Sequence, residues 1–325
     1  MTVFIIRRLM QSVIVLFIMS VIVFVGVFAI GNPIDILISP QADQLERERA
    51  IHELGLDLPL WQQYLTFLVN ALHGNLGRSF ALSEPALRLI VERLPASLEL
   101  ALSAFLLSLV VGLPLGLWAG LRPKAISSKA IMAGSILGFS LPTFWQGLMF
   151  IMVFAVMLGW LPSTGRGETA AWLGFSSSLF TRDGWAHLTL PSLNLALANS
   201  ALIIRLTRAG VREVVHQDYV RFARAKGLRA SRVVFVHVLR NILIPLVTVL
   251  GLELGGLIAF GVVTETIFAW PGMGKLLIDS IYRLDRPVVV AYLMMIVVLF
   301  ILINLAVDIL YSIIDPRVRL TDMKS

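Results

Sequence analysis

The sequence predicts an all-α membrane protein with six transmembrane helices. Of its 325 residues, 58% are hydrophobic and only 14% are charged, whereas a soluble domain carries about a quarter charged residues. Uncharged apolar runs recur along the chain, and a helix needs about 20 such residues to cross a bilayer. The basic residues also gather in alternate loops, which is the pattern of cytoplasmic loops in membrane proteins.

The uncharged runs define the six expected spans. In chain order they are Leu9 to Ile34, Leu100 to Leu121, part of Ala130 to Gly165, the run between Asp183 and Arg205, the run after Arg240, and the run between Arg286 and Asp308. Glu253 interrupts the fifth run. The apolar patch Ala170–Phe180 is too short to span and is expected to be an interfacial or loop segment.

The loop charges predict the orientation. Seventeen of the 27 Lys and Arg residues fall at the two termini and in the second and fourth loops, which leaves about +13 on that side and about −2 on the other. By the positive-inside rule both termini are cytoplasmic. The basic pI is therefore a topology signal and gives no support for nucleic-acid binding. Arg7 and Arg8 resemble the start of a signal peptide, but the apolar run after them is long enough for an uncleaved first span.

These boundaries divide the chain into four parts. Residues 1–34 hold the N-terminus and first span, 35–98 form a long outer loop, 99–312 form the transmembrane core, and 313–325 form a cytoplasmic tail. In the outer loop, Asp57 and Pro59 are expected to start an amphipathic helix that Gly74 ends. Two interpretations of that helix remain open: it lies on the membrane surface, or it docks an external partner or takes part in gating.

Glycines in the spans indicate close helix packing. Gly112, Gly116 and Gly120 recur at every fourth position of the second span, and Gly251, Gly255 and Gly256 lie in the fifth. Such small residues let a second helix approach closely. Either a helix of the same chain or one of a second subunit fits this pattern.

The sequence lacks the residues that several kinds of chemical site require. There is no cysteine, so the chain has neither disulfides nor thiolate metal sites, and its five histidines show no metal-ligand spacing. The segment Gly272 to Lys275 departs from a phosphate-binding loop, because Ala269 replaces the required glycine and Leu276 the required Ser or Thr. This segment is expected to be a tight turn. We expect a chain without catalytic activity.

The fourth loop, Arg205 to Arg240, is the most informative stretch, with nine basic residues and two acidic ones. Its middle predicts a short amphipathic helix that ends at Gly227, where the chain turns with a left-handed backbone. Ser231 is expected to cap a second helix that returns to the membrane. On charge alone, the loop is an ordinary topology signal; the order of its residues carries more information.

The segment Tyr219-Val-Arg-Phe-Ala-Arg-Ala-Lys-Gly227 resembles the EAA loop of binding-protein-dependent ABC importer permeases. Arg221, Phe222 and Ala223 stand where the general pattern has Glu-Ala-Ala. The dipeptide/oligopeptide group also places Arg first, with Thr at the position of Phe222. The resemblance implies that the loop, residues 211–238, forms a coupling helix against the ATPase subunit. The residues that would make this contact are Tyr219, Arg221, Phe222, Ala223, Lys226 and Gly227.

Other stretches extend the resemblance to this group over nearly the whole chain. They are Arg7 to Leu9, Leu54 to Tyr64, Gly74 to Ser79, Glu92 to Glu99, Pro142 to Trp145, Gly159 to Ser163, Thr264 to Gly274 and Asp315 to Arg319. Together they are similar to the B-type permease subunit and imply a type I importer fold in the bacterial inner membrane. The implied partners are a C-type permease subunit, two ATPase subunits that bind ATP and magnesium, and a soluble or lipid-anchored solute-binding protein.

The sequence says less about which substrate is imported and which residues line its translocation path. Relatives in this group import dipeptides, longer peptides, glutathione, opines or nickel complexes. Glu253 and Glu265 are the candidate residues of the translocation path, and Glu253 is equally suited to a hydrogen bond across a subunit interface. Two other classes compete: a secondary transporter, which would show internal repeats, and a membrane-embedded enzyme, which would need paired polar groups within its spans.

Overall fold

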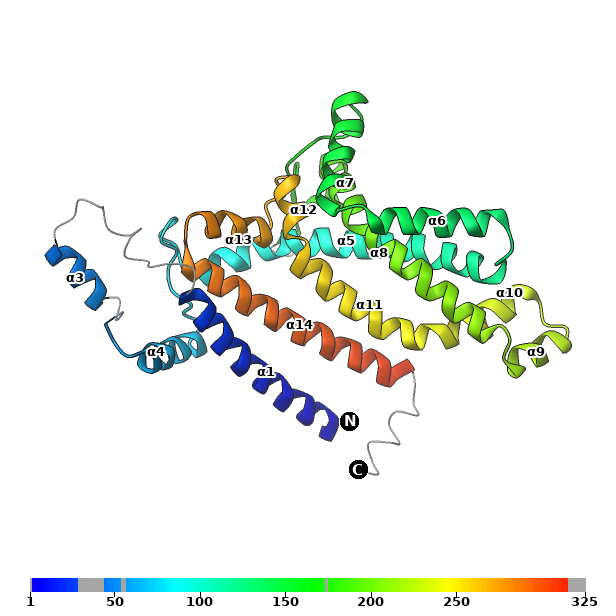
Figure 1. The fold of residues 1–325 in the computed structure, drawn as a ribbon, viewed down its shortest axis with the longest axis horizontal. Coiled ribbons are helices and arrows are strands. Elements are labelled where there is room, and N and C mark those ends of the chain that lie inside the picture. Colours follow the sequence, from blue (N-terminus) through cyan, green and yellow to red (C-terminus); the bar gives the residue numbers. More distant parts are fainter. Residues whose placement is uncertain (1, 29–43, 54–56, 173–174, 315–325) are drawn as a thin grey trace. The chain divides into compact units, whose positions relative to one another are not determined.

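The computed structural model describes residues 2–28, 44–53, 57–172 and 175–314 (Figure 1). The chain divides into two compact units, Met1–Ala96 with Pro271–Ile301, and Ser97–Trp270 with Leu302–Ser325. Apart from one short hairpin, the described residues that form regular structure are helical. This confirms the predicted helical class.

The first unit contains α1 (Thr2–Phe28), α3 (Gln44–Glu53), α4 (Leu60–Leu72), α13 (Met273–Tyr282), the start of α5 (Ala86–Leu121) and most of α14 (Arg286–Ile314). Helix α4 is the predicted amphipathic helix, and Gly74 follows its end with φ +75°. Its start differs from the prediction. Pro59 precedes the first turn, because Asp57 instead contacts His52 through a 2.7 Å hydrogen bond that raises the pKa of His52.

Helix α4 packs against α1 through an aromatic side chain. The Tyr64 hydroxyl and Ser20 Oγ form a 2.8 Å hydrogen bond, and the Tyr64 ring meets the Phe24 ring edge-on with centroids 5.3 Å apart. Trp61 and Leu65, on the same predicted apolar face, stay exposed. One part of the apolar surface of α4 therefore packs against α1, and another part stays exposed.

A buried carboxylate anchors the loop that follows α4. Asp285, between α13 and α14, accepts hydrogen bonds from Ser79 Oγ and from the backbone nitrogens of Phe80 (3.0 Å) and Ala81 (3.3 Å). Three donors satisfy a carboxylate that is otherwise costly to bury. The segment from Gly74 to Ser79, singled out in the sequence, is thereby fixed to the turn between two helices.

The second unit contains the rest of α5, then α6 (Ile126–Ser140), α7 (Thr143–Phe150), the π-helix η1 (Ile151–Met157), strands β1 (Ala170–Trp172) and β2 (Phe175–Ser177), and the 3-10 helix η2 (Ser178–Phe180). It continues with α8 (Arg182–Val214), α9 (Asp218–Ala225), α10 (Ala230–Arg232), the π-helix η3 (Val233–Leu239), α11 (Arg240–Phe260) and α12 (Val262–Ile267). Figure 1 shows α6 lying along α8, and the two helices contact one another closely.

Four described helices are long and apolar enough to cross a membrane: Ala86–Leu121, Arg182–Val214, Pro245–Ile267 and Arg286–Leu310. A fifth span is formed if the pair Ile126–Ser140 and Thr143–Met157, bent by 103°, is counted as one. Helix α1 has the shorter apolar stretch Met10–Gly26, and residues 29–34 of the predicted first span lie outside the described residues. Within the patch Ala170–Phe180, the described residues form the antiparallel pair β1 and β2 and then η2, which agrees with the predicted loop.

Two spans differ from the prediction for physical reasons. Helix α5 starts at Ala86 instead of Leu100, because the charged segment before the apolar run is helical as well, with Arg88 and Glu92 paired at i,i+4 spacing. The third span is broken at Leu141 and Pro142, since proline has no N–H to continue the helix. Gln146 Nε2 donates to the carbonyls of Gly138 (2.9 Å) and Leu141 (2.8 Å), two acceptors beside the break.

The glycine stripe of the second span packs inside the chain. A Cβ added to Gly112 would lie 2.7 Å from Ile203 Cγ2 of α8. One added to Gly116 would lie 2.9 Å from the Ile204 carbonyl oxygen, and one added to Gly120 2.6 Å from Val211 Cβ. The structure thus decides between the two alternatives for this stripe: these glycines bring α5 and α8 of the same chain together.

Candidate functional site

Helix α9 lies at the turn after α8 and is fixed by two buried residues. Val220 and Ala223 point into a cluster formed with Val211 of α8 and Val233 and Val238 of η3. The predicted amphipathic helix is present, and its inner face is now defined. Ala223 is part of the internal core, and Val220, which the sequence analysis did not single out, is fully buried.

The opposite face of α9 is exposed and combines aromatic rings with positive charge. Phe222 is 62% exposed and Tyr219 42%, and the Lys226 ammonium lies 4.5 Å from the centroid of the Phe222 ring. Arg221 is also exposed and lies 3.8 Å from Asp218. Desolvation raises the pKa of the Tyr219 phenol. Aromatic side chains and arginine are enriched at protein interfaces.

Gly227 makes the turn that the sequence predicts. Its φ is +74°, and the Gly227 N–H donates to the Arg224 carbonyl at 2.9 Å. The chain then enters α10, whose first turn is preceded by Arg229, so Ser231 is inside the helix and does not cap it. From there α10, η3 and α11 follow without a gap. The exposed face of α9 is therefore connected through a short turn and a continuous helical stretch to a transmembrane helix.

The two candidate path residues have different surroundings. Glu253 is half-buried within α11, about 12 Å along the span from Pro245 at 1.5 Å per residue. Glu265 is buried in α12 and accepts a 2.6 Å hydrogen bond from Ser97 Oγ of α5. Glu265 therefore joins α12 to α5 within this chain, while Glu253 keeps part of its surface accessible.

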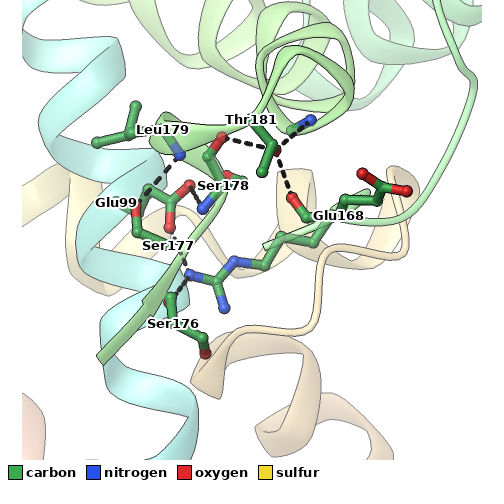
Figure 2. Close-up of polar contacts among 9 residues, drawn as sticks. Glu99, Glu168, Ser176, Ser177, Ser178, Leu179 and Thr181 are labelled. Carbon is green, nitrogen blue, oxygen red and sulfur yellow. Dashed lines mark hydrogen bonds and ion pairs between the residues drawn. The ribbon is translucent and has the colours of Figure 1, made fainter. Parts of the chain in front are cut away.

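A second polar site, which the sequence analysis did not find, lies around Glu99 of α5 (Figure 2). Arg166 forms an ion pair with Glu99, and the two side chains are only 13% and 4% exposed. Arg166 Nη2 also donates to the Ser176 carbonyl at 2.8 Å, and Glu99 Oε1 accepts from the Ser178 N–H at 3.1 Å. We call Glu99, Arg166, Ser176 and Ser178 the outer clamp. The feature of the sequence that could have indicated this site is Glu99, a carboxylate at the edge of an apolar run.

The outer clamp holds the loop between η1 and α8. Thr181 Oγ1 donates to the Glu168 carbonyl at 2.6 Å and accepts from the Gly184 N–H at 3.0 Å (Figure 2). The Gly165 N–H donates to the Phe268 carbonyl after α12 at 2.8 Å. Three segments that are distant in sequence thus meet around one buried ion pair.

The described residues hold no candidate metal site. Among residues 2–28, 44–53, 57–172 and 175–314, no group of three His, Asp or Glu side chains is placed to hold a metal ion. Gly272 precedes α13, so the expected tight turn at Gly272 to Lys275 is wrong: the segment starts a helix, because Met273 and Leu276 bury apolar side chains.

Comparison with known proteins gives consistent matches. Residues 112–320 match the binding-protein-dependent transport system inner membrane component, and residues 1–101 match the N-terminal region of such membrane components. The chain is 43% identical to the di/tripeptide transport system permease DppB of Pseudomonas aeruginosa, covering 89% of this chain and 90% of the relative. It is 40% identical to the oligopeptide transport system permease AppB of Bacillus subtilis, over 98% of this chain and 100% of the relative.

Two further matches extend this comparison. The glutathione transport system permease GsiC of Escherichia coli is 38% identical and covers 97% of this chain and 98% of its own length. Among solved structures, an inward-facing MetNI methionine ABC transporter chain aligns with a TM-score of 0.54 at 19% identity, over 72% of this chain and 100% of that one. This structural likeness shows a shared fold.

Proposed function

Because the chain belongs to the family of inner membrane components of binding-protein-dependent transport systems, we propose that it forms half of the pore of an ATP-driven importer for di- and oligopeptides. The family makes it a multi-pass, non-catalytic transport subunit. The observation that supports the substrate class is the near full-length similarity to permeases of di/tripeptide and oligopeptide systems. Glutathione, itself a short peptide, is the second candidate because of the match to a glutathione permease.

The proposed architecture has six spans, with α1 as the first and the bent pair α6 and α7–η1 as the third. Residues 1–34, 35–98, 99–312 and 313–325 keep the parts assigned from the sequence, in the arrangement of a type I importer. The partners are a C-type permease, two ATPase subunits and a soluble or lipid-anchored binding protein. We assign the exposed face of α9, with Tyr219, Arg221, Phe222 and Lys226, to the ATPase contact, because exposed aromatic rings and arginine suit an interface. Ala223 and Gly227 position that face.

Purification and uptake test this function together. The tagged chain, extracted from native membranes, is expected to bring down two ATPase subunits, a second permease and a binding protein. Cells that lack the chain are expected to lose uptake of a labelled dipeptide, and glutathione uptake is measured beside it. Purification of the chain alone from membranes that still import the dipeptide would contradict the proposal. Loss of glutathione uptake only would select the second substrate.

The proposed orientation places both termini, α9 and Ser231 in the cytoplasm, which is supported by the uneven distribution of basic residues. The chain has no cysteine, so Ser231→Cys and Thr169→Cys each create a single labelling site at an exposed position. An impermeant thiol reagent is expected to label Thr169→Cys in intact spheroplasts and Ser231→Cys only after the membrane is opened. The reverse pattern would overturn the orientation.

Glu253 is proposed to face the translocation path and to meet the amino group of a peptide. A carboxylate at this depth costs several kcal/mol against lipid, and its side chain is only half covered by its own chain. Glu253→Gln is expected to preserve assembly and basal ATPase activity. Uptake of peptides with a free N-terminus should fall more than uptake of N-acetylated ones. Failure of the variant to assemble would instead place Glu253 at the subunit interface, and equal uptake of both peptides would remove any role for its charge. Glu265→Gln is compared at the other candidate position. Because Glu265 is buried against Ser97, its charge should not meet the peptide, and uptake of the two kinds of peptide should change equally.

A further inference from the structure

An apolar groove runs between three helices of the second unit. It has a volume of about 300 Å³ and is lined by Leu107, Val111 and Leu115 of α5, by Ile131, Gly134 and Ser135 of α6, and by Leu193, Ala196, Leu197, Ser200, Ala201 and Ile204 of α8. A Cβ added to Gly134 would meet nothing within 4 Å. The groove therefore has unfilled apolar space beside α6.

The α8 residues that line the groove are followed along the helix by two arginines. These lining residues form two rows at i,i+4 spacing, and residues at this spacing lie above one another on one helix face. The row of Leu193, Leu197 and Ala201 continues to Arg205, and the row of Ala196, Ser200 and Ile204 continues to Arg208. The Arg205 guanidinium also lies 4.5 Å from the centroid of the Phe139 ring of α6. Arg205 and Arg208 are not lining residues themselves, but they directly follow the lining along α8.

These two arginines have no anionic partner among the described residues. Both side chains are half-buried, and their Nε atoms are buried without a hydrogen bond in the described part of the chain. Neither forms an ion pair with a described carboxylate. A half-buried guanidinium without a counter-charge is costly, so an anion at this position would stabilise the protein.

The rim of the groove at this end is also positive. The backbone of Arg208 lies beside Gly120 at the end of α5, and the following turn and α6 carry Arg122, Lys124 and Lys129 without an acidic residue between 121 and 140. The Arg122 guanidinium lies 4.2 Å from the ring centroid of Trp118, whose indole N–H donates to Ser127 Oγ at 3.0 Å. Trp and Arg in this arrangement are typical of a membrane–water interface.

We propose that this groove binds an anionic phospholipid, with one acyl chain between α5, α6 and α8 and the phosphate on Arg205 and Arg208. Guanidinium groups suit phosphate because their planar N–H groups match its oxygens. Basic pockets between helices on the cytoplasmic side are suited to anionic head groups. The site rests on the orientation given under Proposed function, which puts Arg205 and Arg208 at the cytoplasmic leaflet.

A helix of the second permease subunit fits the groove less well. The cytoplasmic end of a partner helix would carry basic residues by the positive-inside rule, which would repel Arg205 and Arg208. A phosphate offers the opposite charge.

Native mass spectrometry of the full chain in detergent tests the site with phosphatidylglycerol and phosphatidylcholine of the same acyl composition. We expect phosphatidylglycerol to be retained preferentially, and Arg205→Gln with Arg208→Gln to weaken its binding about tenfold. Gly134→Leu, which fills the groove and leaves both arginines, should weaken it as well. The matched control is Arg229→Gln with Arg232→Gln, which removes the same charge from exposed positions of the fourth loop and should retain the lipid.

Three outcomes would overturn the lipid site. Equal retention of the two lipids would show non-specific adhesion, and equal loss in the control variant would show a general charge effect. Binding to the isolated chain but not to the assembled importer would show that a partner helix occupies the groove. Copurification of the ATPase subunits is followed for every variant. If these subunits are retained while lipid binding is unselective, the lipid site fails and the proposed transport function stands.

Discussion

Replacing Gly227 with valine is expected to abolish ATP-driven uptake while the chain still inserts in the membrane. Gly227 has φ +74°, and a left-handed backbone costs a residue with a Cβ roughly 1–2 kcal/mol, more for a β-branched one. Space is not the obstacle, because an added Cβ would meet nothing within 4 Å. The strain is relieved most easily by moving α9, and that movement would displace Phe222 from the ATPase contact proposed above.

The matched variant is Gly227→Asn, because asparagine tolerates this backbone conformation better than other residues with side chains. Uptake of a labelled peptide and ATP hydrolysis are measured in the reconstituted importer. We expect Gly227→Asn to keep most uptake, and Gly227→Val to lose it while ATP hydrolysis continues without transport. Equal uptake in both variants would mean that the turn has no part in coupling. Membrane levels of each variant separate a coupling defect from poor insertion.

Removing either charge of the outer clamp should destabilise the protein strongly. Taking one partner from a buried ion pair costs about 3–5 kcal/mol, because the other charge stays buried without compensation. Glu99→Gln and Arg166→Gln are therefore each expected to lower the free energy of unfolding by about this amount, and the double variant by less than their sum. Unfolding of the full chain in detergent provides the measurement.

An exposed pair in the same chain serves as the control. Arg88 Nε and Glu92 Oε1 are 2.8 Å apart with side chains 65% and 53% exposed, and exposed pairs contribute about 0–1 kcal/mol. Arg88→Gln should therefore be nearly neutral. If Arg166→Gln is equally mild, then the clamp does not hold the loop between η1 and α8. A large effect together with lost uptake would show that the importer requires this loop to be fixed to α5.

Local properties of the sequence determined the helical class, the approximate spans and the turn at Gly227. Hydropathy depends on about 20 neighbouring residues, and a glycine after an amphipathic run permits a left-handed turn wherever the helix is placed. The amphipathic helix at Leu60–Leu72 was predictable for the same reason. Its start was not, because Asp57 has a competing partner in His52.

Only the tertiary structure decided which side chains meet. The 103° bend after Ser140 has little signal in hydropathy, because it lies inside a continuous uncharged run. Glu99 and Arg166 are 67 positions apart, and Val220 and Ala223 face inward because α8 and η3 cover them. The two rows of α8 residues before Arg205 and Arg208 line an apolar groove only because α5 and α6 pack near that face of α8. These features depend on packing between distant segments, whereas spans and turns depend on neighbours along the chain.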